Sequence, residues 1–175
     1  MTWTAPRIDR PRDMTVKVGD ERTLLQSWLD FQRQTLLVKC QDLTVEQLRL
    51  RSVEPSTLSL LGLVRHMTDV ERSWFRKRCA GEDLRYYYST GENIDGEFDD
   101  VDTADAQADF ERYRAELELA DKSVAHLPLD HTFVHPRSAQ GISLRWVYLH
   151  MIEEYARHNG HADLLRERID GSTGA

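Results

Sequence analysis

A glutamate and a histidine lie one helical turn apart near the C-terminus, in the sequence His-Met-Ile-Glu-Glu-Tyr-Ala-Arg-His. At roughly 100° per residue, His158 falls inside the apolar stripe of the predicted helix and Glu154 falls on its edge, while Glu153 faces solvent. A carboxylate turned inward is costly unless it has a partner. A divalent metal would satisfy both side chains at once, because ligands at positions i and i+4 reach one ion. The spacing therefore predicts a pair of metal ligands.

A second predicted helix offers a third ligand. His66 stands at the border of its apolar stripe, and Glu71 stands inside the stripe. A bordering histidine alone is usually a core or surface residue, but beside the pair on the last helix it predicts a third ligand. Glu71 is then expected to hydrogen-bond the ligating histidine. The alternative is a buried ion pair of Glu71 with an arginine such as Arg145 or Arg157.

Other reactive side chains have plainer interpretations. The remaining loop and helix-end histidines are expected at the surface, with a role at the site as the alternative; they are His126, His131 and His135. The tyrosine run 86–88 either packs onto the helices or roofs a pocket. Two cysteines, Cys40 and Cys79, form neither a disulfide framework nor a C-x-x-C site and are expected to be ordinary thiols near helix ends.

Helical periodicity and capping residues define the elements that must position these side chains. Asp20 is expected to cap the first helix, Ser56 or Thr57 the second, and Ser143 the last. The four long helices are predicted over residues 21–40, 56–80, 103–126 and 143–169, with a short turn at 45–50. Because no strand pattern is visible, we predict an all-α four-helix bundle, in which the long connection 81–102 favours a crossover topology.

The composition sets the class of protein. A length of 175 residues fits one domain, here 20–171, between an N-terminal arm (1–19, with Pro6 and Pro11) and a flexible tail (172–175). The net charge of −7 disfavours nucleic acid as a partner. Apolar runs are far shorter than the roughly 20 residues that span a bilayer, and no signal peptide is visible. We therefore expect a cytoplasmic protein with no membrane partner.

Two motifs together resemble a known family. His66 stands in Leu-Val-Arg-His-Met-x-x-x-Glu-x-x-Trp, and residues 150–163 read His-Met-Ile-Glu-Glu-Tyr-Ala-Arg-His-Asn-Gly-His-Ala-Asp. Over residues 21–171 the chain is similar to the DinB/YfiT-like superfamily of metalloenzymes. The resemblance implies a four-helix bundle, a divalent metal such as zinc or nickel, and a homodimer.

Carried over by position, the ligands implied by the resemblance are His66, Glu154 and His158. Many members have three histidines. The His, Glu, His set is similar to that of mycothiol-dependent maleylpyruvate isomerase and related thiol S-transferases. The Asn-Gly-His-Ala-Asp segment departs from the Arg-Gly-Gln of other members, so His161 is either an extra ligand or a hydrogen-bond partner of one.

Three protein ligands leave a coordination position open, as catalytic sites do. A small thiol placed there would lose its proton, so we expect a thiol-dependent transferase or isomerase acting on an electrophilic small molecule. Arginine outnumbers lysine by 19 to 4, which suggests a GC-rich source and favours mycothiol as the thiol. The alternatives are a metal-dependent hydrolase, a non-catalytic metal-stabilised binding or stress-response protein, and a metal-free bundle in which Glu154 pairs with an arginine.

Overall fold

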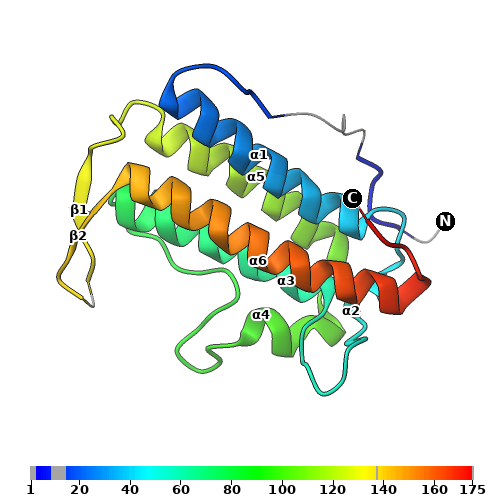
Figure 1. Ribbon diagram of the computed structural model, residues 1–175. Coiled ribbons are helices and arrows are strands. Elements are labelled where there is room, and N and C mark those ends of the chain that lie inside the picture. The colour runs from blue at the N-terminus through cyan, green and yellow to red at the C-terminus, as the bar shows by residue number, and fades with distance from the viewer. Residues whose placement is uncertain (1–2, 9–14, 137, 175) are drawn as a thin grey trace.

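Four long helical segments lie side by side in the computed structural model, which describes residues 3–8, 15–136 and 138–174 (Figure 1). They are α1 (Glu21–Cys40), α3 (Leu60–Glu71) continued by the π-helix η1 (Arg72–Cys79), α5 (Ala106–Val124) and α6 (Leu144–Asp170). Helix α1 packs against α6, and α3 packs against α5 and α6. This mostly helical architecture agrees with the predicted all-α class.

Figure 1 also shows the direction of each helix. Helices α1 and α6 run the same way, whereas α3 and α5 run the opposite way. Because α3 and α5 are parallel neighbours, the chain between them must return along the length of the helices. That connection carries the short helix α4 (Gly96–Asp99) and the 3-10 helix η2 (Asp100–Thr103) beneath α3.

Several predicted helix ends are confirmed. Asp20 caps α1 by accepting a hydrogen bond from the Thr23 N–H, and Ser143 caps α6 in the same way. The expected short turn is helix α2 (Val45–Arg49). Gly171, at a φ of 78°, ends α6 in the left-handed conformation that glycine adopts without strain.

Two predicted helix starts are wrong. Helix α3 is capped by Ser59, whose hydroxyl accepts from Gly62 N–H, and not by Ser56 or Thr57. The Ser56 hydroxyl instead accepts from the Leu58 N–H within the preceding turn. Helix α5 begins at Ala106, because Asp105 is its cap and residues 100–103 form the separate turn η2. Side chains that can cap recur every few residues here, so spacing alone did not select the correct one.

The segment between α5 and α6 contains two strands that the sequence did not indicate. Strands β1 (Thr132–Val134) and β2 (Gly141–Ser143) pair antiparallel, with Phe133 opposite Ile142. Three residues are too few to show an alternating pattern. The small hairpin extends beyond the end of the helices (Figure 1).

The start of the chain packs against the connector between α1 and α3. Ala5 is 1% exposed, donates to the Leu43 carbonyl and accepts from the Asp42 N–H. The expected arm also includes Pro11, which lies outside the described residues.

Candidate functional site

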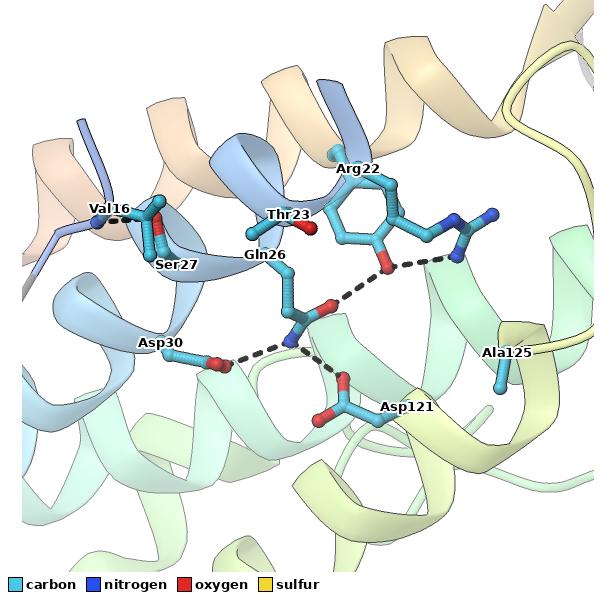
Figure 2. Close-up of a pocket in the computed structure, with 9 residues that line it drawn as sticks. Val16, Arg22, Thr23, Gln26, Ser27, Asp30, Asp121 and Ala125 are labelled. Carbon is cyan, nitrogen blue, oxygen red and sulfur yellow. Dashed lines mark hydrogen bonds between the residues drawn. The ribbon is translucent and has the colours of Figure 1, made fainter. Parts of the chain in front are cut away.

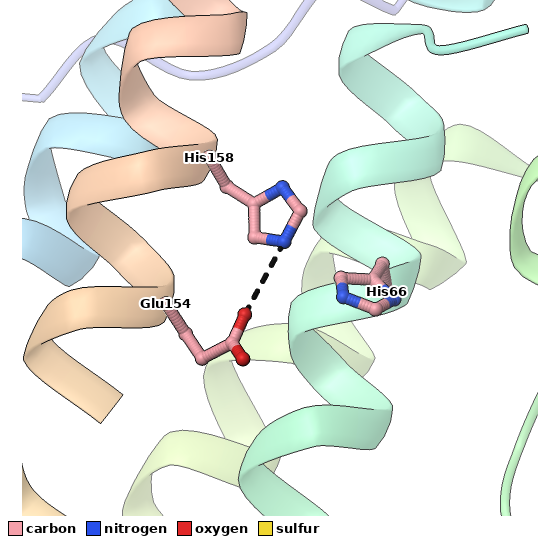
Figure 3. A group of neighbouring side chains, drawn as sticks. All are labelled: His66, Glu154 and His158. Carbon is pink, nitrogen blue, oxygen red and sulfur yellow. Dashed lines mark ion pairs between the residues drawn. The ribbon is translucent and has the colours of Figure 1, made fainter. Parts of the chain in front are cut away.

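His66, Glu154 and His158 meet between α3 and α6 (Figure 3). One ligand atom from each lies within 4.8 Å of the other two. The Nε2 atom of His158 is 3.5 Å from a Glu154 carboxylate oxygen, and the ring centroids of His66 and His158 are 4.8 Å apart. The structure therefore brings the three predicted ligands together, while metal binding by them stays a prediction.

The three side chains suit a divalent cation in charge and position. A cation bound at roughly 2 Å needs donor atoms about 3–4 Å apart, which small side-chain movements provide. Burial, together with the neighbouring His66 and His161, lowers the pKa of His158 to about 4. The imidazole is therefore neutral at pH 7, as a metal ligand must be. The side chains of His66, Glu154 and His158 are 24%, 18% and 13% exposed, so the site is open to small molecules.

Glu97 orients His66. The His66 Nδ1 atom lies 3.2 Å from the Glu97 carboxylate, and the His66 ring stacks on Phe98 at 5.3 Å between ring centroids. When Nδ1 donates its proton to Glu97, Nε2 is left as the acceptor that a metal requires. Burial opposes ionisation of Glu97, but the hydrogen bond with His66 prevails and its pKa is lowered.

The predicted role of Glu71 beside His66 is wrong. Glu71 is fully buried and forms a two-pronged ion pair with Arg33, with both N–O distances 2.8 Å. Five residues turn a helix by roughly 140° from the starting side chain, so Glu71 faces away from His66 and toward α1. The alternative, a buried ion pair of Glu71 with an arginine, is confirmed, but its partner is Arg33 and neither of the two arginines suggested. Arg145 pairs with Glu21, and Arg157 pairs with Glu153.

The long connection is fastened to α3 by two charged side chains. The Asp69 carboxylate accepts the backbone N–H groups of residues 87, 88 and 89 at 2.8, 2.9 and 3.2 Å. Arg65 donates to the Gly96 carbonyl and pairs with Asp109. These contacts fix the connection at residues 87–89 and at Gly96, directly before Glu97, and so place its carboxylate beside His66. No pattern in the sequence of this connection indicates a register that would align Glu97 with α3.

A cavity of about 240 Å³ adjoins His66 and Glu97. The π-helix η1 forms one wall with Ser73, Trp74 and Arg78. Stretches of π-helix are rare and often occur at functional sites. The complete lining is His66, Asp69, Val70, Ser73, Trp74, Arg78, Tyr86, Ser89 and Glu97.

The three tyrosines divide between the two predicted roles. Tyr86 lines the cavity, and its hydroxyl lies 3.0 Å from that of Ser73. Tyr87 and Tyr88 pack onto the helices, where their hydroxyls donate to Glu116 and Asp109 respectively.

Two further histidines touch the ligand cluster. His161 Nδ1 lies 3.4 Å from His158 Nδ1, on the side of the ring away from Glu154. His150 has Nε2 3.5 Å from a Glu154 oxygen and stacks on Trp146. With Glu153 and Glu154 it forms a second, more exposed group of metal-ligating side chains.

The other three histidines lie outside the ligand cluster. His126 is exposed after α5. His131 Nε2 lies 3.2 Å from the Cys79 carbonyl. His135 stacks on Trp74 at 5.9 Å between ring centroids, on the cavity wall rather than at the ligands.

A larger cavity, of about 580 Å³, shares no residue with this cluster (Figure 2). Its polar groups are bonded to one another: Arg22 donates to the Tyr148 hydroxyl, which donates to Gln26, and Gln26 donates to Asp30 and Asp121. The polar side chains that line this cavity therefore form one hydrogen-bonded network.

The cysteines do not supply a nucleophile. Both are free and buried, Cys40 at the end of α1 and Cys79 at the end of η1, as predicted. Burial raises the pKa of Cys40 to about 12 and that of Cys79 to about 11. Both thiols are therefore protonated at neutral pH, and a reactive thiolate would have to come from a separate molecule.

Among the described residues, every helix falls short of the length and apolar character that a bilayer crossing requires.

Comparison with known proteins identifies the family. A protein-family model described as Mycothiol-S-transferase matches residues 24–171. This range includes His66, Glu154 and His158 and every residue that lines the cavity beside His66. Searches of curated proteins and of solved structures found no match. The resemblance to the DinB/YfiT-like superfamily, of which this family is a member, is confirmed. The chain belongs to the mycothiol S-transferase family.

Proposed function

We propose that this protein is a metal-dependent enzyme that transfers mycothiol to, or uses it to isomerise, a small electrophile, on a DinB-like four-helix bundle of residues 20–171. The observation that supports this proposal is the meeting of His66, Glu154 and His158 beside a cavity. The family match supports the thiol.

His66, Glu154 and His158 would hold the metal. The carboxylate of Glu154 suits a dication, and neutral imidazoles suit zinc or nickel. A divalent metal supplies positive charge that stabilises the thiolate form of a thiol at neutral pH.

The remaining side chains position the ligands. Glu97 holds the proton of His66 on Nδ1 and so keeps Nε2 directed to the site. His161 Nδ1 lies 3.4 Å from His158 Nδ1, and this contact supports a role for His161 as a hydrogen-bond partner of that ring rather than as a fourth ligand. The connection that carries Glu97 and Phe98 covers one side of His66 and limits the access of water.

Metal content tests the first half of the proposal. In protein purified without a histidine tag, elemental analysis should find about one zinc or nickel per chain. His158→Ala and Glu154→Gln should lose most of it, because each removes a ligand. His126→Ala, an exposed histidine away from the cluster, is the matched control and should retain the metal. Substoichiometric metal in the wild type would reject the site.

Thiol transfer tests the second half. The metal-loaded protein should accelerate the reaction of mycothiol with a generic electrophile such as monobromobimane, and removal of the metal should abolish the acceleration. A rate equal to the uncatalysed reaction for every physiological thiol would favour a binding protein. We also propose a homodimer in the cytoplasm, and light scattering would test the dimer.

A further inference from the structure

One oxygen of Glu97 lacks a partner. Glu97 is 8% exposed; its Oε1 atom contacts His66, whereas its Oε2 atom is buried without a hydrogen bond among the described residues. A buried carboxylate oxygen with no donor is costly, and such groups in native proteins usually mark a missing ligand, ion or water.

The nearby protein donors do not reach this oxygen. Arg65, next to His66 on α3, directs its terminal nitrogens to the Gly96 carbonyl and to Asp109, and its buried Nε atom forms no hydrogen bond among the described residues. The N–H groups of residues 87, 88 and 89 are bound by Asp69. The partner of the free oxygen must therefore come from elsewhere, and Glu97 lines the cavity beside His66.

The cavity indicates what that partner is. Its volume of about 240 Å³ is below the roughly 300–1,000 Å³ of drug-sized sites, so it takes a part of a molecule about the size of one ring. Ser73, Tyr86 and Ser89 line it with hydroxyl groups, which suit a polyhydroxylated ring better than an apolar electrophile.

We propose that Glu97 recognises a hydroxyl or amide N–H on the sugar part of the thiol cosubstrate, seated in the cavity next to the metal ligands. This inference rests on the proposed function. The last torsion of Glu97 is a soft one, so a modest turn of the whole carboxylate directs the free oxygen toward the cavity. Glu97 is thus a positioning residue for His66 and a specificity residue for the thiol.

The test compares two thiols on one variant. Glu97→Gln keeps an acceptor for His66 but replaces the free oxygen with an N–H₂ group. Calorimetric titration of the metal-loaded protein should show the Kd of mycothiol rising about tenfold or more, because a hydrogen bond to a charged group is lost. The Kd of N-acetylcysteine, which lacks the sugar, should change by less than about threefold on the same reasoning. Glu92→Gln, an exposed carboxyl on the same connection, should change neither.

A second measurement needs no transfer chemistry. The sugar fragment of mycothiol without its cysteine should compete with mycothiol for the wild type and fail to compete for Glu97→Gln. Equal weakening of both thiols, unchanged binding of both, or no competition by the fragment in the wild type would overturn the inference. Failure of the wild type to bind mycothiol at all would instead overturn the proposed function, and this inference with it.

Discussion

Arg33 and Glu71 form an ion pair that is almost completely buried between α1 and α3. The two side chains are 3% and 0% exposed, and Glu71 also accepts a hydrogen bond from the Tyr155 hydroxyl. Arg33 extends the network by pairing with Asp30 and Asp121 near the surface. The network therefore links α1, α3, α5 and α6 through one guanidinium.

Replacing Arg33 by Met should destabilise the fold strongly. The substitution leaves the Glu71 carboxylate buried without its cation, which costs about 3–5 kcal/mol of unfolding free energy. Urea denaturation of the variant measures the loss. Arg145→Met, which removes an exposed pair with Glu21, is the control and should cost far less. Equal stability of the Arg33 variant and the wild type would refute this account of the core.

The two cysteines should not react with thiol reagents in the native protein. Their pKa values of about 12 and about 11 leave almost no thiolate at pH 8. A colourimetric thiol assay should count none in the folded protein and two in denaturant. Because burial raises both pKa values, the unfolded chain ionises first, and stability should fall as pH rises above about 9. Rapid reaction of either thiol under native conditions would contradict this.

Sequence reasoning found the three side chains that the structure brings together, but not Glu97, which orients His66. Glu154 and His158 lie on one helix at a spacing that brings their side chains together. His66 could be assigned to the same group because it stands at the border of the apolar stripe of another predicted helix. Glu97 stands 31 positions after His66, on the four-residue helix α4 within a connection that is otherwise irregular. No periodicity relates such a segment to a helix, so its alignment came only from the tertiary contacts of Asp69 and Arg65.

Gly96 allows the connection to approach itself closely. A Cβ atom at this position would lie 2.5 Å from the Tyr88 backbone carbonyl, a distance that real Cβ atoms do not adopt. The same residue supplies the carbonyl that Arg65 binds and directly precedes Glu97. The backbone here therefore determines where the Glu97 carboxylate lies.

Gly96→Ala should weaken metal binding although residue 96 is not a ligand. The added methyl group displaces the backbone and with it the hydrogen bond of Glu97 to His66; loss of such an orienting contact typically costs about 10–100-fold in metal affinity. Chelator competition measures the affinity. Gly91→Ala is matched to it, because a Cβ at 91 meets nothing within 4 Å. The same affinity for both variants would show that Glu97 does not depend on this backbone contact.

The long helices could be predicted from the sequence, whereas the change of helix type inside one of them could not. Apolar spacing extends across α3 into η1, so residues 60–80 read as one regular helix. The π-type bonds, such as Ala80 N–H to the Phe75 carbonyl at 2.9 Å, shift the register after Glu71. Arg72 and Arg76 both pair with Glu116 on α5, and these ion pairs stabilise the wider turn of the π-helix. Because the stabilising residue, Glu116, belongs to another helix, the periodicity of residues 60–80 alone does not indicate the π-helix.

Metal binding should stabilise the whole molecule. The proposed ligands come from α3 and α6, and the 91 residues between His66 and His158 mean that the unfolded chain holds no such site. At a free metal concentration of about 100 times Kd, binding adds about 2.7 kcal/mol, which corresponds to a rise in Tm of roughly 5–10 °C for a chain of this length. Differential scanning fluorimetry with added zinc or nickel checks this. His158→Ala should show no rise, and a similar rise in that variant would place the metal elsewhere.

The two walls of the cavity beside His66 are held by different means. The π-helical wall is tied into the helices by Arg72, Arg76 and Glu116, so changes there disturb the core. The opposite wall is held largely by hydrogen bonds of its backbone to Asp69 and Arg65, which do not depend on the side chains at residues 86 and 89. Ligand selectivity is therefore separable from folding. Substitutions at positions such as Tyr86 or Ser89 would change which molecules bind in the cavity without changing the fold.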